Sequence, residues 1–315
     1  MIKQSIAKVG ILTAAILSVP AVSFAGTAGK DMKAVVEKCK ESCITGDLGI
    51  NVVSQYVSRG VIFENQAGII QPYADLYFRL YEGEGFLNKI SLNLGIWNSF
   101  HSRKTDAGLV NGTPGSSSTR SWYEFDFTAG LSFTFAKNFN FTPSYYTFLS
   151  PNDGFSTFQG LNLALGYDTT DLIGFNLAPK VQVLFELENK AGTGADEGVY
   201  YEVGITPAFP IGTTGLTIAV PIAAGFGSND FYGSLNTSTG NIDDEAFGYF
   251  TAGVTASYAL AFIPECYGKW TASAGYAYYY MGDGTSDFNT QERGGAVRDN
   301  KENEHVFSAG ISLAF

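Results

Sequence analysis

The sequence has no long apolar run after its first residues, and this excludes membrane proteins built from helices. A transmembrane helix needs about 18 or more consecutive apolar residues, and no later segment reaches that length. The early apolar stretch 9–19 is shorter, follows Lys3 and Lys8, and precedes the small residues Ser23 and Ala25. We therefore predict a cleavable secretory signal peptide over residues 1–25.

Charge is also scarce, and basic residues are scarcer than acidic ones. Charged residues make up 16% of the chain, and its formal net charge is −11. This excess of acid argues against nucleic acid as a partner. Aromatic residues reach 15% and glycine occurs 37 times, a composition too aromatic and too poor in charge for an ordinary soluble domain.

Histidine occurs only at His101 and His305, so catalytic and metal sites have few candidate residues. In the strands predicted below, alternation points His101 inward and His305 outward, and Ser308 lies on the opposite face from His305. A barrel hydrolase needs a histidine placed beside a serine or an acid, and we see no such arrangement. We therefore predict that the protein is not an enzyme.

The chain has only three cysteines, Cys39, Cys43 and Cys266. They form no C-x-x-C pair and have no neighbouring histidine, so we expect neither a metal site nor a cofactor. Both regions are expected on the periplasmic side, in an oxidising compartment. We predict a structural disulfide from Cys266 to either Cys39 or Cys43, with one thiol left over.

The sequence does contain clear alternation with a period of two, which is typical of strands with two different environments. In segment 122–135, large apolar residues alternate with carboxylates and small polar residues. Twelve segments follow this pattern: 48–57, 70–81, 89–100, 122–135, 139–149, 159–167, 175–188, 199–209, 216–226, 247–262, 270–281 and 305–315. Since every backbone amide must be paired inside lipid, strands can cross a bilayer only as a closed barrel.

We therefore predict an all-β fold, a transmembrane antiparallel β-barrel of about twelve strands over residues 47–315. The connections after every second strand are short, whereas several others are long and polar, as in outer-membrane barrels. The last strand, 305–315, resembles the ending that the assembly machinery of bacterial outer-membrane barrels reads. We expect the cell outer membrane as the location, with the lipid bilayer and, through Phe315, that machinery as partners. The alternatives are ten or fourteen strands, or a secreted soluble all-β protein.

Residues 26–46 differ from the rest of the chain. Segment 30–43 (KDMKAVVEKCKESC) combines high charge with helix-like spacing, so we expect a short periplasmic helix ahead of the first strand. A mobile leader and a lumen plug or docking element are equally compatible with this pattern.

Alternation also assigns charged side chains to the lumen wall, where they are candidates for selectivity. The inward set comprises Arg59, Asp75, Arg79, Glu124, Asp126, Lys180, Glu186 and Glu202. Acids outnumber bases in this set, which favours cations if the lumen is open. Alternatively, the acids and bases pair into a network that rigidifies a closed barrel.

The first predicted hairpin contains Ser54, Tyr56, Arg59 and Gly60 in the pattern S-x-Y-x-x-R-G. This part of the chain resembles a widespread family of uncharacterised bacterial outer-membrane proteins whose first strand commonly carries the motif. The resemblance implies a porin-like barrel with no settled substrate. Gly60 would allow a tight first turn, and Arg59, inward by parity, could pair with Asp75 or Glu124.

These observations predict an outer-membrane porin-like channel for the passive diffusion of small polar or cationic solutes. The alternative is a structural or adhesive barrel whose lumen is occluded and which acts through its extracellular loops.

Overall fold

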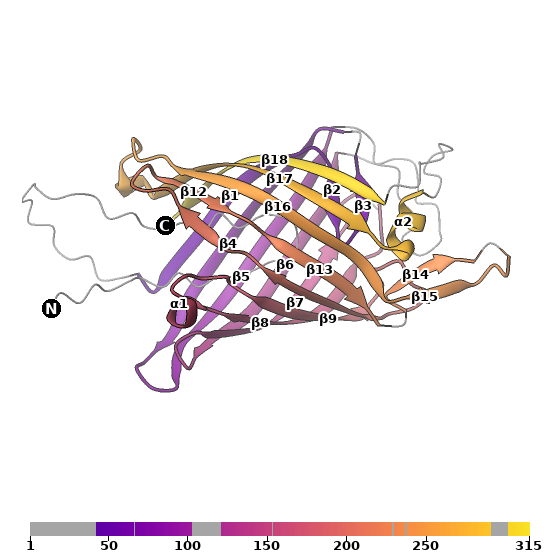
Figure 1. Ribbon diagram of the computed structural model, residues 1–315, viewed down its shortest axis with the longest axis horizontal. Coiled ribbons are helices and arrows are strands. Elements are labelled where there is room, and N and C mark those ends of the chain that lie inside the picture. Colours follow the sequence, from indigo (N-terminus) through magenta and orange to yellow (C-terminus); the bar gives the residue numbers. More distant parts are fainter. Residues whose placement is uncertain are drawn as a thin grey trace, which may run out of the picture.

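The alternating segments form strands because each presents apolar side chains on one face and small or polar ones on the other. The computed structural model describes residues 42–65, 67–102, 121–152, 154–228, 230–236, 238–290 and 302–315. Its main antiparallel sheet closes where β1 (Ile44–Val53) pairs with β18 (Asn303–Ala314). Figure 1 shows the strands winding obliquely around the barrel.

The barrel wall consists of twelve antiparallel strands, two of which are interrupted. Between β1 and β18, the strands are β4 (Ile69–Glu82), β5 (Leu87–His101), β6 (Trp122–Phe135), β7 (Phe139–Leu149), β8 (Phe158–Tyr167), β9 (Lys180–Glu188), β10 (Val199–Ile205) continued by β11 (Ala208–Pro210), β12 (Leu216–Ala219) continued by β13 (Ile222–Gly227), β16 (Phe247–Ala259) and β17 (Lys269–Met281). Pro207 and Pro221 lie at the two interruptions, because proline has no N–H to give to the ladder.

The prediction of a twelve-stranded antiparallel barrel is confirmed, and β6 and β7 have the predicted bounds. One difference is that β9 begins at Lys180 rather than at Phe175. The residues before it interrupt the pairing, since Ala178 has a φ of 47° and Pro179 lacks an N–H.

The first strand also differs, because it ends at Val53 rather than at Val57. Ser54 pairs with β18 just after the end of β1: its N–H donates to the carbonyl of Phe307, and its hydroxyl accepts the N–H of Phe307, both at 2.9 Å. Beyond this residue the chain leaves the barrel wall.

Short and long connections lie at opposite ends of the barrel (Figure 1). The end with short connections, which we assign to the periplasm, carries α1 (Thr170–Ile173) and the turn η2 (Glu265–Tyr267). The extracellular end carries the hairpin β14 (Tyr232–Leu235) and β15 (Ile242–Glu245), followed further along by α2 (Asp283–Thr290). The expected signal peptide and nearly all of the expected periplasmic helix lie outside the described residues.

None of the helices in the described part of the chain is long and apolar enough to cross a membrane.

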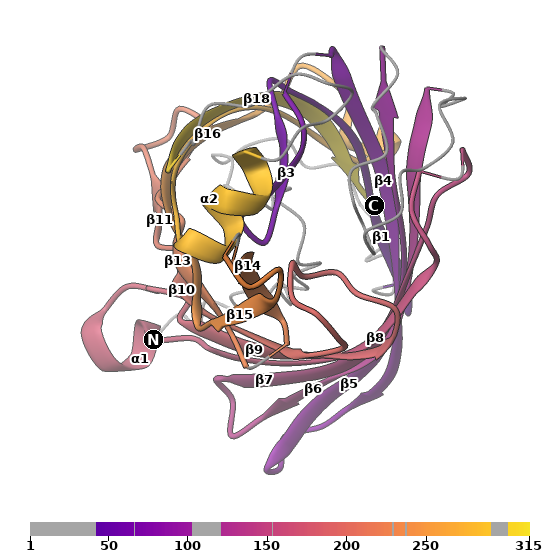
Figure 2. The same cartoon turned by 90° about the vertical axis from the view of Figure 1, so that its right-hand side faces the viewer.

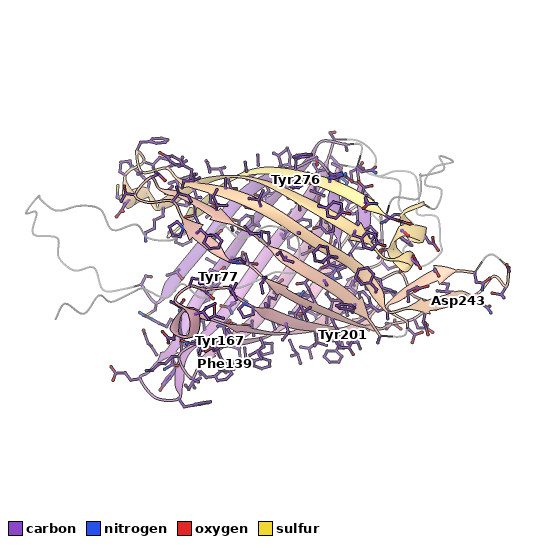
Figure 3. All side chains as sticks on the ribbon, in the orientation of Figure 1. Tyr77, Phe139, Tyr167, Tyr201, Asp243 and Tyr276 are labelled. Carbon is purple, nitrogen blue, oxygen red and sulfur yellow. The ribbon has the colours of Figure 1, made fainter. Side chains whose placement is uncertain are left out.

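The outer face of the barrel is apolar and has aromatic side chains towards both ends. Exposed aliphatic side chains on this face include Ile70, Ile96, Leu131, Val181, Val203 and Val254. Phe139 and Tyr167 lie near the periplasmic end, and Tyr201 lies nearer the extracellular end (Figure 3). An apolar band flanked by aromatic residues is the surface that a bilayer requires. The protein is therefore an outer-membrane β-barrel surrounded by lipid, and the soluble alternative is excluded.

Candidate functional site

A hairpin folds into the barrel instead of lying in its wall. Its strands β2 (Tyr56–Ser58) and β3 (Val61–Glu64) pair with each other, and Figure 2 shows β3 inside the ring of wall strands. We call residues 56–64 the plug hairpin. It turns at Arg59 and Gly60, whose φ angles of 50° and 81° give the tight hairpin turn that glycine favours. Gly60 does make a tight turn, but at the tip of this plug hairpin rather than between two wall strands.

The turn of the plug hairpin is fastened to α2. The side-chain amide of Asn289 donates to the carbonyl of Gly60 and accepts the N–H of Ile62, both at 2.9 Å. A Cβ atom on Gly60 would lie 2.9 Å from the side chain of Thr285, so the helix also packs tightly on the turn. One asparagine therefore satisfies two buried backbone groups of the hairpin.

Two tyrosines tie the plug hairpin to other elements. Tyr232 of β14 donates to the carbonyl of Arg59 at 2.9 Å. Burial raises the pKa of the Tyr232 phenol, which keeps it a donor at neutral pH. Tyr56 of the hairpin donates at 2.8 Å to the carboxylate of Glu124 on β6.

The side chain of Arg59 reaches across the lumen. The plug hairpin leaves the wall between β1 and β4, and β10 lies about halfway around the barrel from these strands. The guanidinium carbon of Arg59 lies 5.3 Å from the ring centre of Phe148 on β7 and 5.8 Å from that of Tyr200 on β10. These are cation–π distances, so the plug hairpin is held at the wall opposite its origin.

Apolar side chains fill the space around the plug hairpin. They form two buried clusters that combine residues of the hairpin, the wall and β14, including Tyr56, Val57, Ile62, Trp97, Tyr123, Phe148, Phe158, Leu184, Tyr200, Phe231, Tyr232, Tyr249, Tyr279 and Met281. Phe231, Tyr232 and Tyr279 have no exposed surface. The plug hairpin is therefore packed against the wall within the extracellular part of the lumen.

The structure places Glu124, Asp126 and Glu186 on the buried inner face, as alternation predicted. Glu124 and Asp126 are neighbours on β6 and lie beneath the plug hairpin. Glu186 accepts backbone N–H groups of Ala191, Gly192 and Gly198, and thereby holds the loop after β9. A role of these carboxylates in selectivity stays a prediction.

Lys180 and Glu202 are brought together on the neighbouring strands β9 and β10. Their charged groups are 3.8 Å apart, and Glu202 also accepts hydrogen bonds from Tyr200 at 2.7 Å and Tyr249 at 2.6 Å. In this part of the lumen, an acid and a base are therefore paired in a network, as the hypothesis of a closed, rigid barrel proposed.

Other predicted lumen residues do not meet as expected. Arg79 pairs at 2.7 Å with Glu82 at the periplasmic end of β4. Asp75 lies directly opposite Asp47 in the register of β1 and β4. The expected ion pair from Arg59 to Asp75 or Glu124 is wrong, because Arg59 sits at the tip of the plug hairpin and forms no ion pair with any described residue.

Several buried polar atoms of the lumen have no hydrogen-bond partner among the described residues. They are Nε and Nη2 of Arg59, Nε1 of Trp97, both carboxylate oxygens of Asp126, Oδ1 of Asn162, and both amide atoms of Gln182. Buried polar groups in folded proteins are normally paired with protein or with water. These atoms mark a polar part of the lumen among the described residues.

A serine–histidine contact, which the sequence did not reveal, lies at the extracellular end of β5. Ser99 Oγ is 2.9 Å from Nε2 of His101, and Nδ1 of His101 is 4.0 Å from a carboxylate oxygen of Glu64. Both Ser99 and His101 follow the inward parity of β5, but Glu64 arrives from the plug hairpin. Ser99 has no exposed surface, so this arrangement offers no accessible nucleophile.

Cys43 and Cys266 are free, exposed thiols at the periplasmic end of the barrel, just before β1 and in η2. Cys39 lies outside the described residues. The predicted disulfide at Cys266 stays a prediction.

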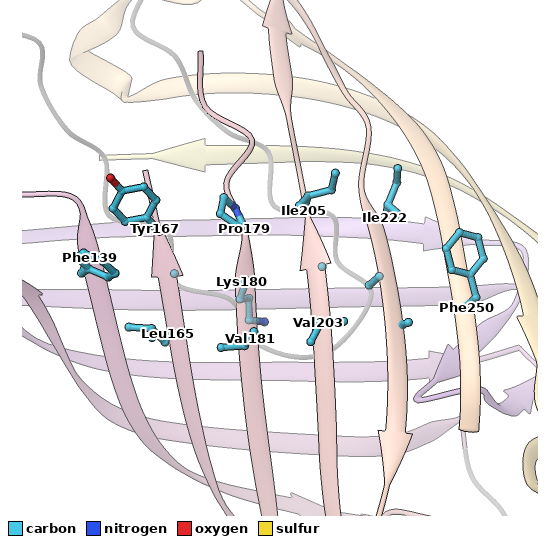
Figure 4. Close-up of a pocket in the computed structure, with 14 residues that line it drawn as sticks. Phe139, Leu165, Tyr167, Pro179, Lys180, Val181, Val203, Ile205, Ile222 and Phe250 are labelled. Atoms are coloured by element: carbon cyan, nitrogen blue, oxygen red, sulfur yellow. The ribbon is translucent and has the colours of Figure 1, made fainter. Parts of the chain in front are cut away.

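A groove of about 500 Å³ lies on the outer wall rather than in the lumen (Figure 4). Its lining includes Phe139, Leu165, Val181, Val203 and Phe250, which come from strands β7 to β16. Val181 and Val203 belong to the exposed outer face, so the groove is part of the lipid-facing surface.

No protein-family model matches this chain, and no curated protein matches it in sequence. Solved structures similar to it are barrels. An outer membrane channel from Pseudomonas putida F1 has 10% identity and a TM-score of 0.46, covering 86% of this chain and 95% of that one. The NanC porin has 11% identity and a TM-score of 0.43, with coverage of 84% and 98%. The transport unit of the autotransporter AIDA-I from Escherichia coli has 12% identity and a TM-score of 0.41, with coverage of 90% and 93%. At such identities and TM-scores, these likenesses say nothing about solute or activity in this chain.

Proposed function

We propose that the protein is a channel for small polar solutes with a preference for cations, and that the plug hairpin closes its extracellular end. The observation that carries this proposal is the set of buried polar atoms in the lumen without a hydrogen-bond partner among the described residues, above all those of Arg59 on the plug hairpin and of Asp126 and Gln182 on the wall. A purely structural interior would gain stability by pairing or replacing them. A conduit needs polar groups that remain available to water and solute.

The cation preference rests on the charges of the inner face. Among the described residues, the carboxylates of Asp47, Asp75, Glu124 and Asp126 have no basic side chain in ion-pair contact, whereas Lys180 is paired with Glu202. Carboxylates in a confined lumen concentrate cations and exclude anions. We propose no catalytic role, since Ser99 beside His101 is buried.

The motif S-x-Y-x-x-R-G supports a proposed kinship with the family that it resembles. Ser54 ends the wall strand, Tyr56 binds Glu124, and Arg59 and Gly60 form the tip of the plug hairpin. We propose that proteins sharing the motif share this hairpin. Phe315 pairs through its backbone with Gly46 and exposes its ring, which suits its proposed recognition by the assembly machinery.

A second function, a structural or adhesive barrel with an occluded lumen, is favoured by the packed apolar clusters at the extracellular end. The hairpin of β14 and β15, which projects beyond the barrel (Figure 1), would then be the contacting element. Conductance separates the two functions, because only the channel passes ions once the plug hairpin is displaced.

The cation preference is tested by reversal potentials in a KCl gradient across a planar bilayer. We expect a cation-selective potential that is weakened in the double variant Glu124→Gln and Asp126→Asn, mainly at low salt, where screening is slight. Asp243→Asn on the exposed hairpin is the matched control and should leave the potential unchanged. An unaltered potential in the double variant would exclude the two carboxylates as the filter.

A further inference from the structure

Two side chains that can carry opposite charges, Arg59 at the tip of the plug hairpin and Asp126 on β6, lie buried in the lumen. The side chains of Arg59 and Asp126 are 7% and 2% exposed. Nε and Nη2 of Arg59 donate no hydrogen bond to the described residues, and the carboxyl group of Asp126 has only that of Glu124 beside it and accepts no N–H from the described residues. The two groups are close enough for their charges to interact, but they form no ion pair. Burying charges in this way is costly unless something bridges them.

The surroundings of the two groups supply a further donor and a further acceptor. Trp97 stands directly opposite Asp126 in the register of β5 and β6, is 5% exposed, and leaves its indole N–H without a partner. Glu124 lies two residues before Asp126 on the same face and already accepts the Tyr56 hydroxyl. Arg59 is oriented by the rings of Phe148 and Tyr200.

We propose that this space is a binding site for a small zwitterion, such as an α-amino acid. The ammonium group of the solute would lie at the carboxylate of Asp126, beside Glu124. Its carboxylate would accept from the guanidinium of Arg59 and the indole N–H of Trp97. A simple cation or anion would leave one of the two groups without a partner of opposite charge.

The solute would enter the site from the periplasmic side. Along β4, the inward side chains change from the buried Gln71 to the partly exposed Asp75 and Arg79 as the strand approaches that end. A small zwitterion would be the solute class of the proposed channel, so the site rests on that function. Binding of the zwitterion can nevertheless be measured without transport.

Binding is measured by the fluorescence of Trp97 in the detergent-purified protein carrying Trp122→Phe and Trp270→Phe, which leaves one tryptophan. The probes are L-alanine, ethylammonium, which lacks the carboxylate, and propionate, which lacks the ammonium group. We expect a saturable response to alanine, and binding at least about tenfold weaker for both fragments. Equal responses to the three probes, or none to alanine, would overturn the proposal.

Two variants locate the site in the same background. Asp126→Asn and Arg59→Gln should each weaken alanine binding by about tenfold or more, whereas Asp243→Asn on β15 should not change it. Retained heat-modifiable migration shows that each variant is folded. If both variants bind alanine as the parent does, the site is wrong. Ion conductance of the same samples distinguishes a failure of the binding site from a failure of the channel. A protein that conducts ions but does not bind alanine refutes the binding site and not the channel.

Discussion

At the scale of single residues, the plug depends on partners that are remote in the chain. Asn289 lies 229 residues beyond Gly60, and Tyr232 lies 173 beyond Arg59. Alternation predicted the inward direction of Glu124 and Asp126, because parity is a local property of a strand. It could not predict the contacts of Asn289 and Tyr232, which depend on how loops from different strands pack together.

Asn289→Ala tests whether the two hydrogen bonds of Asn289 hold the plug hairpin in place. The substitution removes the partners of the Gly60 carbonyl and the Ile62 N–H, and each unpaired buried group costs about 1–3 kcal/mol. We expect the plug hairpin to loosen and the open probability in planar bilayers to rise at least about tenfold. Asn241→Ala, on the exposed connection between β14 and β15, is the matched control. Equal open probabilities in the two variants would contradict the role of Asn289 in holding the plug hairpin in the lumen.

At the scale of elements, wall strands were predictable and the plug hairpin was not. Val53 and Val57 continue the same period-two pattern, so a wall strand and an inward hairpin have the same local signature. Only the exchange of hydrogen bonds between Ser54 and Phe307 marks the boundary. Similarly, α2 has a polar sequence without apolar periodicity, and its contacts with β14 and β3 support it instead.

The three cysteines give a prediction about the connection between the leader and the barrel. Cys43 and Cys266 lie at the same end of the barrel, and Cys39 is four residues before Cys43. A bond from Cys266 to this region would close a loop of over two hundred residues and stabilise the fold by several kcal/mol in the chain-entropy model.

We expect mass spectrometry of non-reduced tryptic peptides to find the Cys266 peptide linked to one carrying Cys39 or Cys43. Cys39→Ser and Cys43→Ser, made separately, identify the partner, and a reduced sample is the control. A Cys266 peptide present only as a free thiol would refute the disulfide.

At the scale of the whole molecule, closure of the sheet determines stability. The ladder between β1 and β18 runs from Asp47 and Ala314 to Val53 and Ser308, so the wall has no free edge there. The number of strands and their closure were predictable, because lipid allows few other solutions for alternating segments. The position of the plug hairpin in the lumen was not, since its apolar residues resemble those of the wall.

A closed ring of strand hydrogen bonds should resist unfolding by detergent. We expect the purified protein to migrate faster on a denaturing gel when unheated than after boiling, and to require detergent for solubility. Boiled and unboiled samples of one preparation provide the comparison. A mature chain that is soluble and monomeric without detergent would contradict the barrel in lipid.

The central claim is that this barrel is a conduit closed by residues 56–64, and single-channel conductance tests it most directly. The wild type should be compared with a variant in which these residues are replaced by a short Gly-Ser linker, and with a control that shortens the exposed tip between β14 and β15. We expect rare or small openings in the wild type and the control, and a large, stable, cation-selective conductance without the plug hairpin. A folded variant that still passes no current would contradict the channel and leave the structural barrel as the function.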